Sequence, residues 1–151
     1  MKYFPFFLQL NKLSCLIIGG GSVAERKLDL LVKANADITI VSIEFTDYIL
    51  ELAKTHNIKC IIKEYSQKLL EEKRYKFVIA ATNNVTLNEQ VAKDCDNHNI
   101  LINVVDQPKI CDFIFPSILE RGDITVAVST GGASPVLARM LRTKLETMVP
   151  S

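Results

Sequence analysis

The sequence CLIIGGGSVA, residues 15–24, constrains the fold more than any other part of the chain. An apolar run too short for anything but a buried strand stops at three glycines, and a helical pattern begins at once. Glycine lets the backbone turn sharply and approach a ligand, and the helix start offers N–H groups and partial positive charge to a pyrophosphate. The spacing Gly19-x-Gly21-x-x-Ala24 matches a dinucleotide-binding fingerprint, although a bare match is as typical of a tight strand–helix turn.

Apolar runs and helical periods alternate along the first two thirds of the chain. We expect strands at 13–18, 38–41, 58–62, 77–81 and 100–105, and helices at 23–35, 48–56, 67–73 and 86–97. Such alternation implies parallel strands with helices on both faces, and strands buried on both faces are continuously apolar, as these are. The fold class is therefore predicted to be α/β, with a Rossmann-like parallel sheet.

The pattern changes after residue 109. Segments 113–119 and 124–129, joined by Glu120-Arg121-Gly122-Asp123, predict an antiparallel hairpin. Ser134 and Pro135 are typical of an N-cap and first helical residue, and the helix is expected to run through Met148. A hairpin and one helix bury little alone and need either the preceding sheet or a second subunit against them. Of the two, we expect a homodimer interface. The predicted domains are 1–111, a dinucleotide-binding domain, and 112–151, a region for dimerisation and substrate binding.

Composition narrows the classes of partner and compartment. The 151 residues carry 18 basic and 17 acidic side chains, so no strong field indicates a nucleic-acid partner. The four cysteines show neither metal-ligand nor redox spacing, which favours a reducing, cytoplasmic compartment and no metal site. The apolar N-terminus breaks at Pro5, too early for a signal or membrane segment. His56 and His98 are expected to be surface or capping residues.

Five further motifs are more specific than the glycine turn. They are residues 19–27 (GGGSVAERK), 80–83 (AATN), 103–108 (NVVDQP), 113–117 (FIFPS) and 129–135 (STGGASP). In this order the chain resembles the precorrin-2 dehydrogenase family, the N-terminal domains of siroheme synthases. The resemblance implies oxidation of precorrin-2 to sirohydrochlorin with NAD⁺ as acceptor, toward siroheme or cobalamin. Members of that family commonly continue into a small helical domain, whereas this sequence stops at Ser151.

The cofactor is expected at the carboxyl edge of the sheet. Backbone N–H groups of Gly19, Gly21, Ser22 and Val23 form the expected pyrophosphate cradle. The resemblance implies further contacts at Ile43 and Glu44, and at Thr82 and Asn83. The carboxylate of Glu44 would hold ribose hydroxyls and repel a 2′-phosphate, which predicts NAD over NADP. A solvated loop carboxylate at Glu44 and ordinary turn chemistry at Thr82 are the alternatives.

The resemblance assigns the catalytic aspartate to Asp106, which follows the fifth predicted strand. A general base there would take the proton that the substrate loses, whereas a turn aspartate bonded to its own backbone is the alternative. The many carboxylate arms of precorrin-2 call for cations and N–H donors. The candidates are Lys109, Ser129, Thr130, Gly131, Arg139 and Arg142, with the two arginines equally explicable as the solvated face of a helix.

Two other functions are left open by the sequence. The same site could also insert Fe²⁺ or Co²⁺ into sirohydrochlorin, because some members of the family do. A domain that binds NAD as a sensor without chemistry is the second alternative, although such domains have no need of the hairpin or of residues 130–135.

Overall fold

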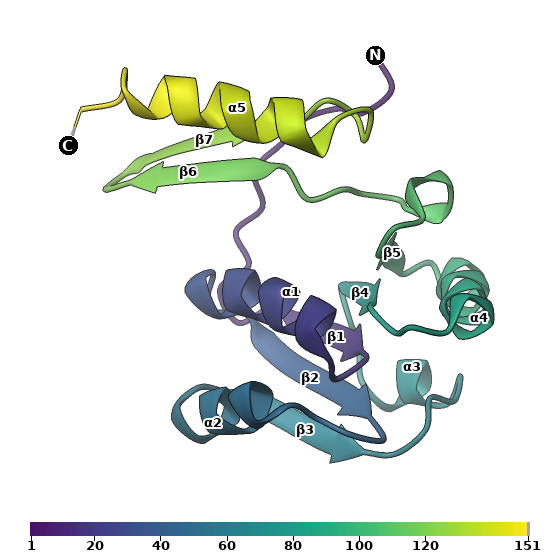
Figure 1. The fold of residues 1–151 in the computed structure, drawn as a ribbon. Coiled ribbons are helices and arrows are strands. Elements are labelled where there is room, and N and C mark those ends of the chain that lie inside the picture. Colours follow the sequence, from purple (N-terminus) through teal and green to yellow (C-terminus); the bar gives the residue numbers. More distant parts are fainter. Residues whose placement is uncertain (151) are drawn as a thin grey trace. The chain divides into compact units, whose positions relative to one another are not determined.

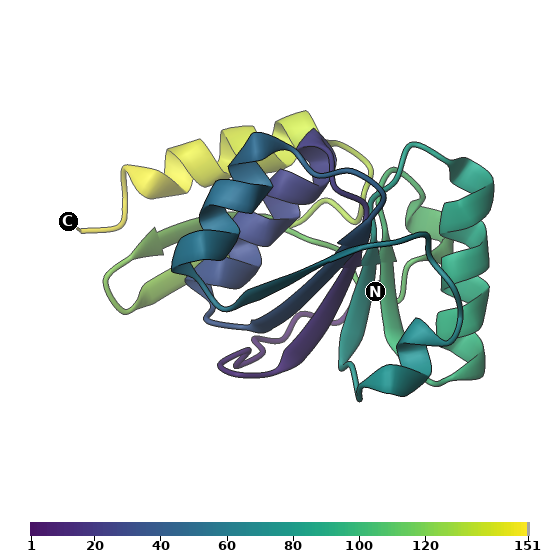
Figure 2. The ribbon, with the colours of Figure 1, turned by 90° about the horizontal axis from the view of Figure 1, so that it is seen from below.

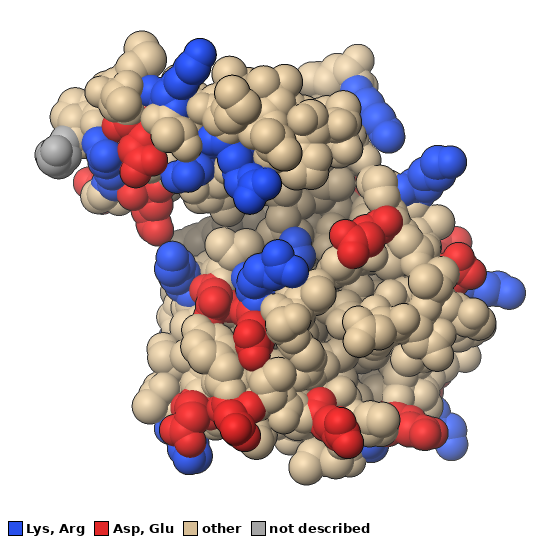
Figure 3. Space-filling view, in the orientation of Figure 1, with Lys and Arg blue, Asp and Glu red and all other residues tan. Residues whose placement is uncertain are grey.

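The computed structural model describes residues 1–150, which form two compact units (Figure 1). The larger unit is Phe6–Asp112, and the smaller joins Met1–Pro5 to the chain from Phe113 onward. Within the described residues, no helix is long and apolar enough to cross a membrane. On the face drawn in Figure 3, both signs of charge occur on each unit, as the near-zero net charge suggests.

The larger unit is built on a parallel five-stranded sheet in the order β3-β2-β1-β4-β5. Its strands are β1 (Ser14–Ile18), β2 (Asp37–Ser42), β3 (Ile58–Ile62), β4 (Phe77–Ala80) and β5 (Leu101–Val104). The chain adds β2 and β3 on one side of β1 and then crosses to place β4 and β5 on the other. This reversal creates a crevice at the carboxyl ends of β1 and β4, where open α/β sheets bind their ligands. The predicted α/β, Rossmann-like class is confirmed.

Helices cover both faces of this sheet. They are α1 (Ser22–Lys33), α2 (Asp47–Thr55), α3 (Leu69–Glu72), α4 (Val85–Asn97) and the short 3₁₀ helix η1 (Pro108–Ile110). Figures 1 and 2 show α1 and α2 on one face, with α3 and α4 on the other. The predicted helix at 67–73 is shortened to one turn, because Lys73 already has extended backbone and ends it.

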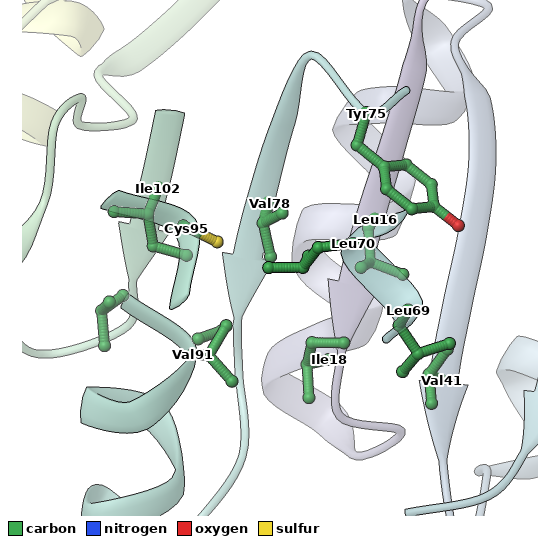
Figure 4. Packing of buried hydrophobic residues seen from close by; sticks show 12 residues of the cluster. Leu16, Ile18, Val41, Leu69, Leu70, Tyr75, Val78, Val91, Cys95 and Ile102 are labelled. Carbon is green, nitrogen blue, oxygen red and sulfur yellow. The ribbon is translucent and has the colours of Figure 1, made fainter. Parts of the chain in front are cut away.

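The core follows from the alternation of side chains along the strands. Figure 4 shows Leu16 and Ile18 of β1 on the same face as Val78 of β4, packed with Val91 of α4 and Leu69 of α3. The alternate residues of β1, Cys15 and Ile17, are also buried, so both faces are dry. Burial raises the pKa of the Cys15 thiol to about 12, which makes it an inert apolar group.

The smaller unit contains a hairpin and a helix. Strands β6 (Ser117–Arg121) and β7 (Ile124–Val128) pair antiparallel, and α5 (Pro135–Glu146) packs on them. The predicted four-residue turn was wrong: Arg121 pairs with Ile124, because Gly122 at φ +54° closes a two-residue turn.

Two further boundaries of the smaller unit differ from prediction. β6 begins after Pro116 rather than at Phe113, since proline has no N–H for the ladder. α5 ends at Glu146 rather than Met148, because Thr147 N–H bonds to Lys144 O three residues back, which tightens the last turn.

Candidate functional site

The glycine turn begins where β1 ends. Gly19 has φ +122°, and its N–H donates to Val41 O at 2.9 Å. A Cβ on Gly19 would lie 2.3 Å from Ala81 O and 2.7 Å from Ala81 C, both backbone atoms. The turn therefore lies directly against the end of β4, and only glycine satisfies both the dihedral angle and this close approach.

The N-terminus of α1 is open to a ligand. The N-cap residues of α2, α4 and α5 are Thr46, Asn84 and Ser134, and the side chain of each accepts a hydrogen bond from a backbone N–H of its helix. The N-cap of α1 is Gly21, which provides no such bond, and a Cβ built on it meets nothing within 4 Å. The first N–H groups of α1 thus face a space without a side-chain acceptor from the cap, as a pyrophosphate requires.

A cavity of about 860 Å³ lies at the carboxyl edge of the sheet. Its size suits a nucleotide cofactor. The residues predicted for the cofactor all line it, namely Gly19, Gly21, Ser22, Val23, Ile43, Glu44, Thr82 and Asn83. The structure therefore brings the predicted cofactor residues together, and their contact with a cofactor stays a prediction.

The loop between β2 and α2 is fixed against the glycines. Thr46 N–H donates to Gly20 O at 3.0 Å, and a Cβ on Gly20 would lie 2.0 Å from Glu44 O. Thr46 Oγ1 also donates to Glu25 Oε1 in the first turn of α1 at 2.5 Å. Ser42 is the last residue of β2, so the exposed Glu44 is the first carboxylate after that strand. This arrangement places a negative charge at the cavity wall, where a ribose is bound in this class of fold.

Several lining residues were missed in the sequence. Phe45 and Thr46 come from the loop after β2, and Lys63 and Tyr65 come from the loop after β3. The rule that ligands bind beyond the carboxyl ends of parallel strands could have identified them, because β3 ends at Ile62. Lys63 pairs with Glu72 at 3.3 Å on the surface.

Thr82 is held by a buried side chain of α4. Asn88, only 3% exposed, accepts from Thr82 Oγ1 at 2.6 Å and donates from Nδ2 to Thr82 O at 3.0 Å. Asn84 caps α4 independently through its bond from Leu87 N–H at 3.0 Å. The turn after β4 is therefore fixed in place, and Asn88 is a further residue that sequence reasoning missed.

Asp106 lies at the same edge of the sheet, outside the residues that line the cavity. Ala80 of β4 is paired with Val104 of β5, and Thr82 and Asp106 each lie two residues after one of these partners. Val105 N–H donates to Ala80 O at 3.0 Å, which keeps the two chains together to this point. Asp106 is exposed and has φ +61°, a left-handed conformation that aspartate tolerates better than most residues.

The loop that carries Asp106 is closed by its neighbours. Cys111 Sγ accepts from Val104 N–H at 3.1 Å, and Asp112 Oδ2 accepts from Ile102 N–H at 2.9 Å. A cation near this loop is Lys27 of α1. Burial and the charge of Arg26 lower the pKa of Lys27, whereas the charges of Cys111 and Asp106 raise it. Asp106 therefore lies on a fixed loop within electrostatic reach of a lysine.

The predicted substrate residues are divided between the two units. Lys109 is exposed in η1 of the larger unit, whereas Ser129, Thr130, Gly131 and Arg139 belong to the smaller one. Thr130 Oγ1 accepts from Ser134 N–H at 3.0 Å, and Gly131 N–H donates to Ser129 Oγ at 3.0 Å. These bonds make a compact turn with Gly131 at φ +64° and Gly132 at φ +85°. Their role toward a substrate stays a prediction.

The remaining candidates from the sequence lie on α5 and at the ends of α2 and α4, and a role of Arg142 toward a substrate stays a prediction. Arg142 pairs with Glu146 one turn along α5 at 3.3 Å. His56 and His98 are the C-cap residues of α2 and α4. Between residues 1 and 150, no group of three or more His, Cys, Asp or Glu side chains could hold a metal ion.

Comparison with known proteins matches two family models to the chain. One, described as NAD(P)-binding, matches residues 6–117, and the other, described as the central part of sirohaem biosynthesis proteins, matches residues 121–148. Siroheme synthase of Methylococcus capsulatus is 48% identical over 100% of this chain and 31% of its own length. Siroheme synthase 2 of Yersinia enterocolitica is 45% identical over 99% of this chain and also 31% of its own length.

Among solved structures, the precorrin-2 dehydrogenase SirC is similar, with a TM-score of 0.80 and 25% sequence identity. The similarity covers 98% of this chain and 72% of SirC. The chain thus has the fold of a precorrin-2 dehydrogenase and spans less than a third of the length of the two siroheme synthases.

Proposed function

The chain belongs to the NAD(P)-binding family of sirohaem biosynthesis proteins, and on that basis we propose that it oxidises precorrin-2 to sirohydrochlorin with NAD⁺. The observation that carries the proposal is the cavity at the carboxyl edge of the sheet, where the α1 N-terminus has no side-chain cap. The names of the siroheme synthases and of SirC support the substrate.

NAD⁺, when bound, supplies the acceptor for a hydride from the reduced tetrapyrrole. Backbone N–H groups of Ser22 and Val23 bind the pyrophosphate, because they lie at the uncapped start of α1. Glu44 accepts hydrogen bonds from the adenine ribose and repels a 2′-phosphate. Thr82 and Asn83, which line the cavity beyond β4, would hold the other half of the dinucleotide.

Asp106 is the general base of the proposed reaction. Precorrin-2 loses a hydride to NAD⁺ and a proton to the carboxylate, and the products are sirohydrochlorin, NADH and a released proton. Ala80 and Val104 pair across the neighbouring strands β4 and β5, and Thr82 and Asp106 each lie two residues after these partners. This common position at the edge of the sheet supports the role of Asp106.

The carboxylate arms of precorrin-2 bind to cations and N–H donors of the chain. Lys109 and Arg139 are both exposed, and Ser129, Thr130 and Gly131 offer hydroxyl and backbone groups on a compact turn. An exposed ammonium or guanidinium group binds a carboxylate through charge-assisted hydrogen bonds.

The protein acts as a homodimer through α5. Val136, Leu137, Met140 and Leu141 on this helix are between 41% and 58% exposed. Ala138 is the buried residue of the helix, so the larger apolar side chains of α5 are left uncovered within one chain. A second copy of the chain supplies the cover, as the self-complementary contact of a twofold dimer does.

Anaerobic incubation with precorrin-2 and NAD⁺ tests the proposed function. We expect sirohydrochlorin absorbance to appear only when both the chain and NAD⁺ are present. Binding of NADH without any conversion of precorrin-2 would instead favour a sensor domain. A Gly21→Ala variant is the matched control, because its added methyl group enters the open space at the cavity and leaves the rest of the fold unchanged.

A further inference from the structure

Asn88 is a polar residue in an apolar position. It lies on α4 in line with Val91 and Cys95, three and seven residues later, both of which are fully buried. A side chain that served packing alone would be apolar here, because burying an amide without partners costs about 1–3 kcal/mol. Asn88 must therefore be explained by its hydrogen bonds.

The hydrogen bonds of the Asn88 side chain all go to Thr82. Its Oδ1 accepts from Thr82 Oγ1 at 2.6 Å and from Thr82 N–H at 3.3 Å, and its Nδ2 donates to Thr82 O at 3.0 Å. One amide thus satisfies the backbone donor, the backbone acceptor and the hydroxyl of Thr82. The turn also has a hydrogen bond of its own, from Asn84 N–H to Thr82 Oγ1 at 3.2 Å. The bonds from Asn88 are therefore additional to those that form the turn.

Thr82 is in turn the neighbour of the glycine turn. A Cβ on Gly19 would lie 3.2 Å from Thr82 N, so the two turns are in direct contact across the crevice between β1 and β4. Any shift of Thr82 changes the wall of the cavity that Gly19 and Thr82 share. Among residues 1–150, Asn88 is the side chain that bonds to both the N–H and the carbonyl of Thr82.

We propose that Asn88 is a positioning residue for the nucleotide site. It fixes the backbone and hydroxyl of Thr82 so that the cavity has its binding geometry before the cofactor arrives. The inference rests on the proposed function of this cavity as the NAD site. Its effect is on cofactor affinity, since Asn88 is buried and meets the ligand only through Thr82.

The test is NADH binding, followed by fluorescence, for the wild type, Asn88→Ala and Asn88→Asp. Asn88→Ala removes all three bonds, and Asn88→Asp keeps the acceptor but places a carboxylate oxygen opposite Thr82 O. We expect the NADH Kd to rise about tenfold in both variants, the size of effect produced by a lost buried hydrogen bond. The KM for NAD⁺ rises with it, while kcat stays within about threefold.

Ser14→Ala is the matched control. Ser14 Oγ donates to Asp37 Oδ2 at 2.9 Å, a comparable bond at the opposite end of β1 from the cavity. We expect this variant to lose some thermal stability and to bind NADH within about twofold of wild type.

Each outcome has a separate meaning. Failure of the wild type to bind NADH would refute the proposed function itself. Wild-type binding with unchanged affinity in a folded Asn88 variant would overturn the inference and leave the proposed function standing. If neither Asn88 variant folds, Asn88 is a residue of the core rather than of the site, and the inference is likewise overturned.

Discussion

Gly19 and Gly21 are expected to respond to alanine in opposite ways. At Gly19 the φ of +122° is unfavourable for any residue with a Cβ, and that atom would lie 2.3 Å from Ala81 O. Backbone strain and overpacking each cost about 1–3 kcal/mol, so we expect Gly19→Ala to lose about 3 kcal/mol or more. For a unit of this size that loss lowers the Tm by about 10 °C.

At Gly21 the same substitution should leave stability nearly unchanged. Its φ of −97° and ψ of −170° are ordinary extended backbone, and the new Cβ meets nothing within 4 Å. Replacing an N-cap glycine by alanine costs less than about 1 kcal/mol. The methyl group, however, occupies the open space at the α1 N-terminus, and we expect NADH affinity to fall at least about tenfold.

Thermal unfolding and NADH titration of both variants measure the two effects separately. A Gly19→Ala variant as stable as wild type would show that the turn at Gly19 does not lie this close to Ala81 O. A Gly21→Ala variant that binds NADH normally would refute the pyrophosphate cradle.

Four further predictions concern catalysis, specificity, assembly and pH. Asp106→Asn should lower kcat by about 10²–10⁴-fold with NADH affinity within about twofold, and near-normal turnover would eliminate the general base. The kcat/KM of the wild type should be at least about tenfold higher with NAD⁺ than with NADP⁺, and Glu44→Ser should reduce this ratio of kcat/KM values. A higher kcat/KM with NADP⁺ would contradict the role of Glu44. Met140→Glu should shift the sedimentation mass from dimer to monomer, and an unchanged mass would exclude this face of α5. The hydrogen bond from Lys73, at 2.6 Å, lowers the pKa of Asp37. The stability that this pair adds to the fold is therefore present above the unfolded pKa of about 4, and it is lost as the pH falls through the lower pKa of the folded state. Because this pair is about a third exposed, urea unfolding should show a difference below about 1 kcal/mol between wild type and Lys73→Met at about pH 6, and a smaller difference at about pH 2.

Much of the fold could be predicted because its signals are local. The apolar runs are each one strand long, and the glycine turn marks the strand–helix junction at Ile18 and Ser22. The hairpin turn could be placed only approximately, since Glu120 and Arg121 are polar and resemble turn residues although they pair with Thr125 and Ile124. The positive φ of Gly122 decides the loop length, and a dihedral angle is not visible in residue type.

The candidate site was predicted less completely, because it depends on contacts between distant segments. Asn88 looks like an ordinary polar helix residue until the burial of Val91 and Cys95 on the same stripe is known. The left-handed backbone of Asp106 depends on closure of its loop by Cys111, which the spacing alone does not indicate. A polar residue within an apolar helical stripe is the sequence signal that could have identified Asn88.

The most direct test of the central claim is the ratio of NADH to sirohydrochlorin formed by the wild-type chain from precorrin-2 and NAD⁺ without oxygen. A hydride transfer at the cavity predicts one NADH for each sirohydrochlorin, with neither product formed when the chain is omitted. Sirohydrochlorin that accumulates without an equal amount of NADH would contradict the account.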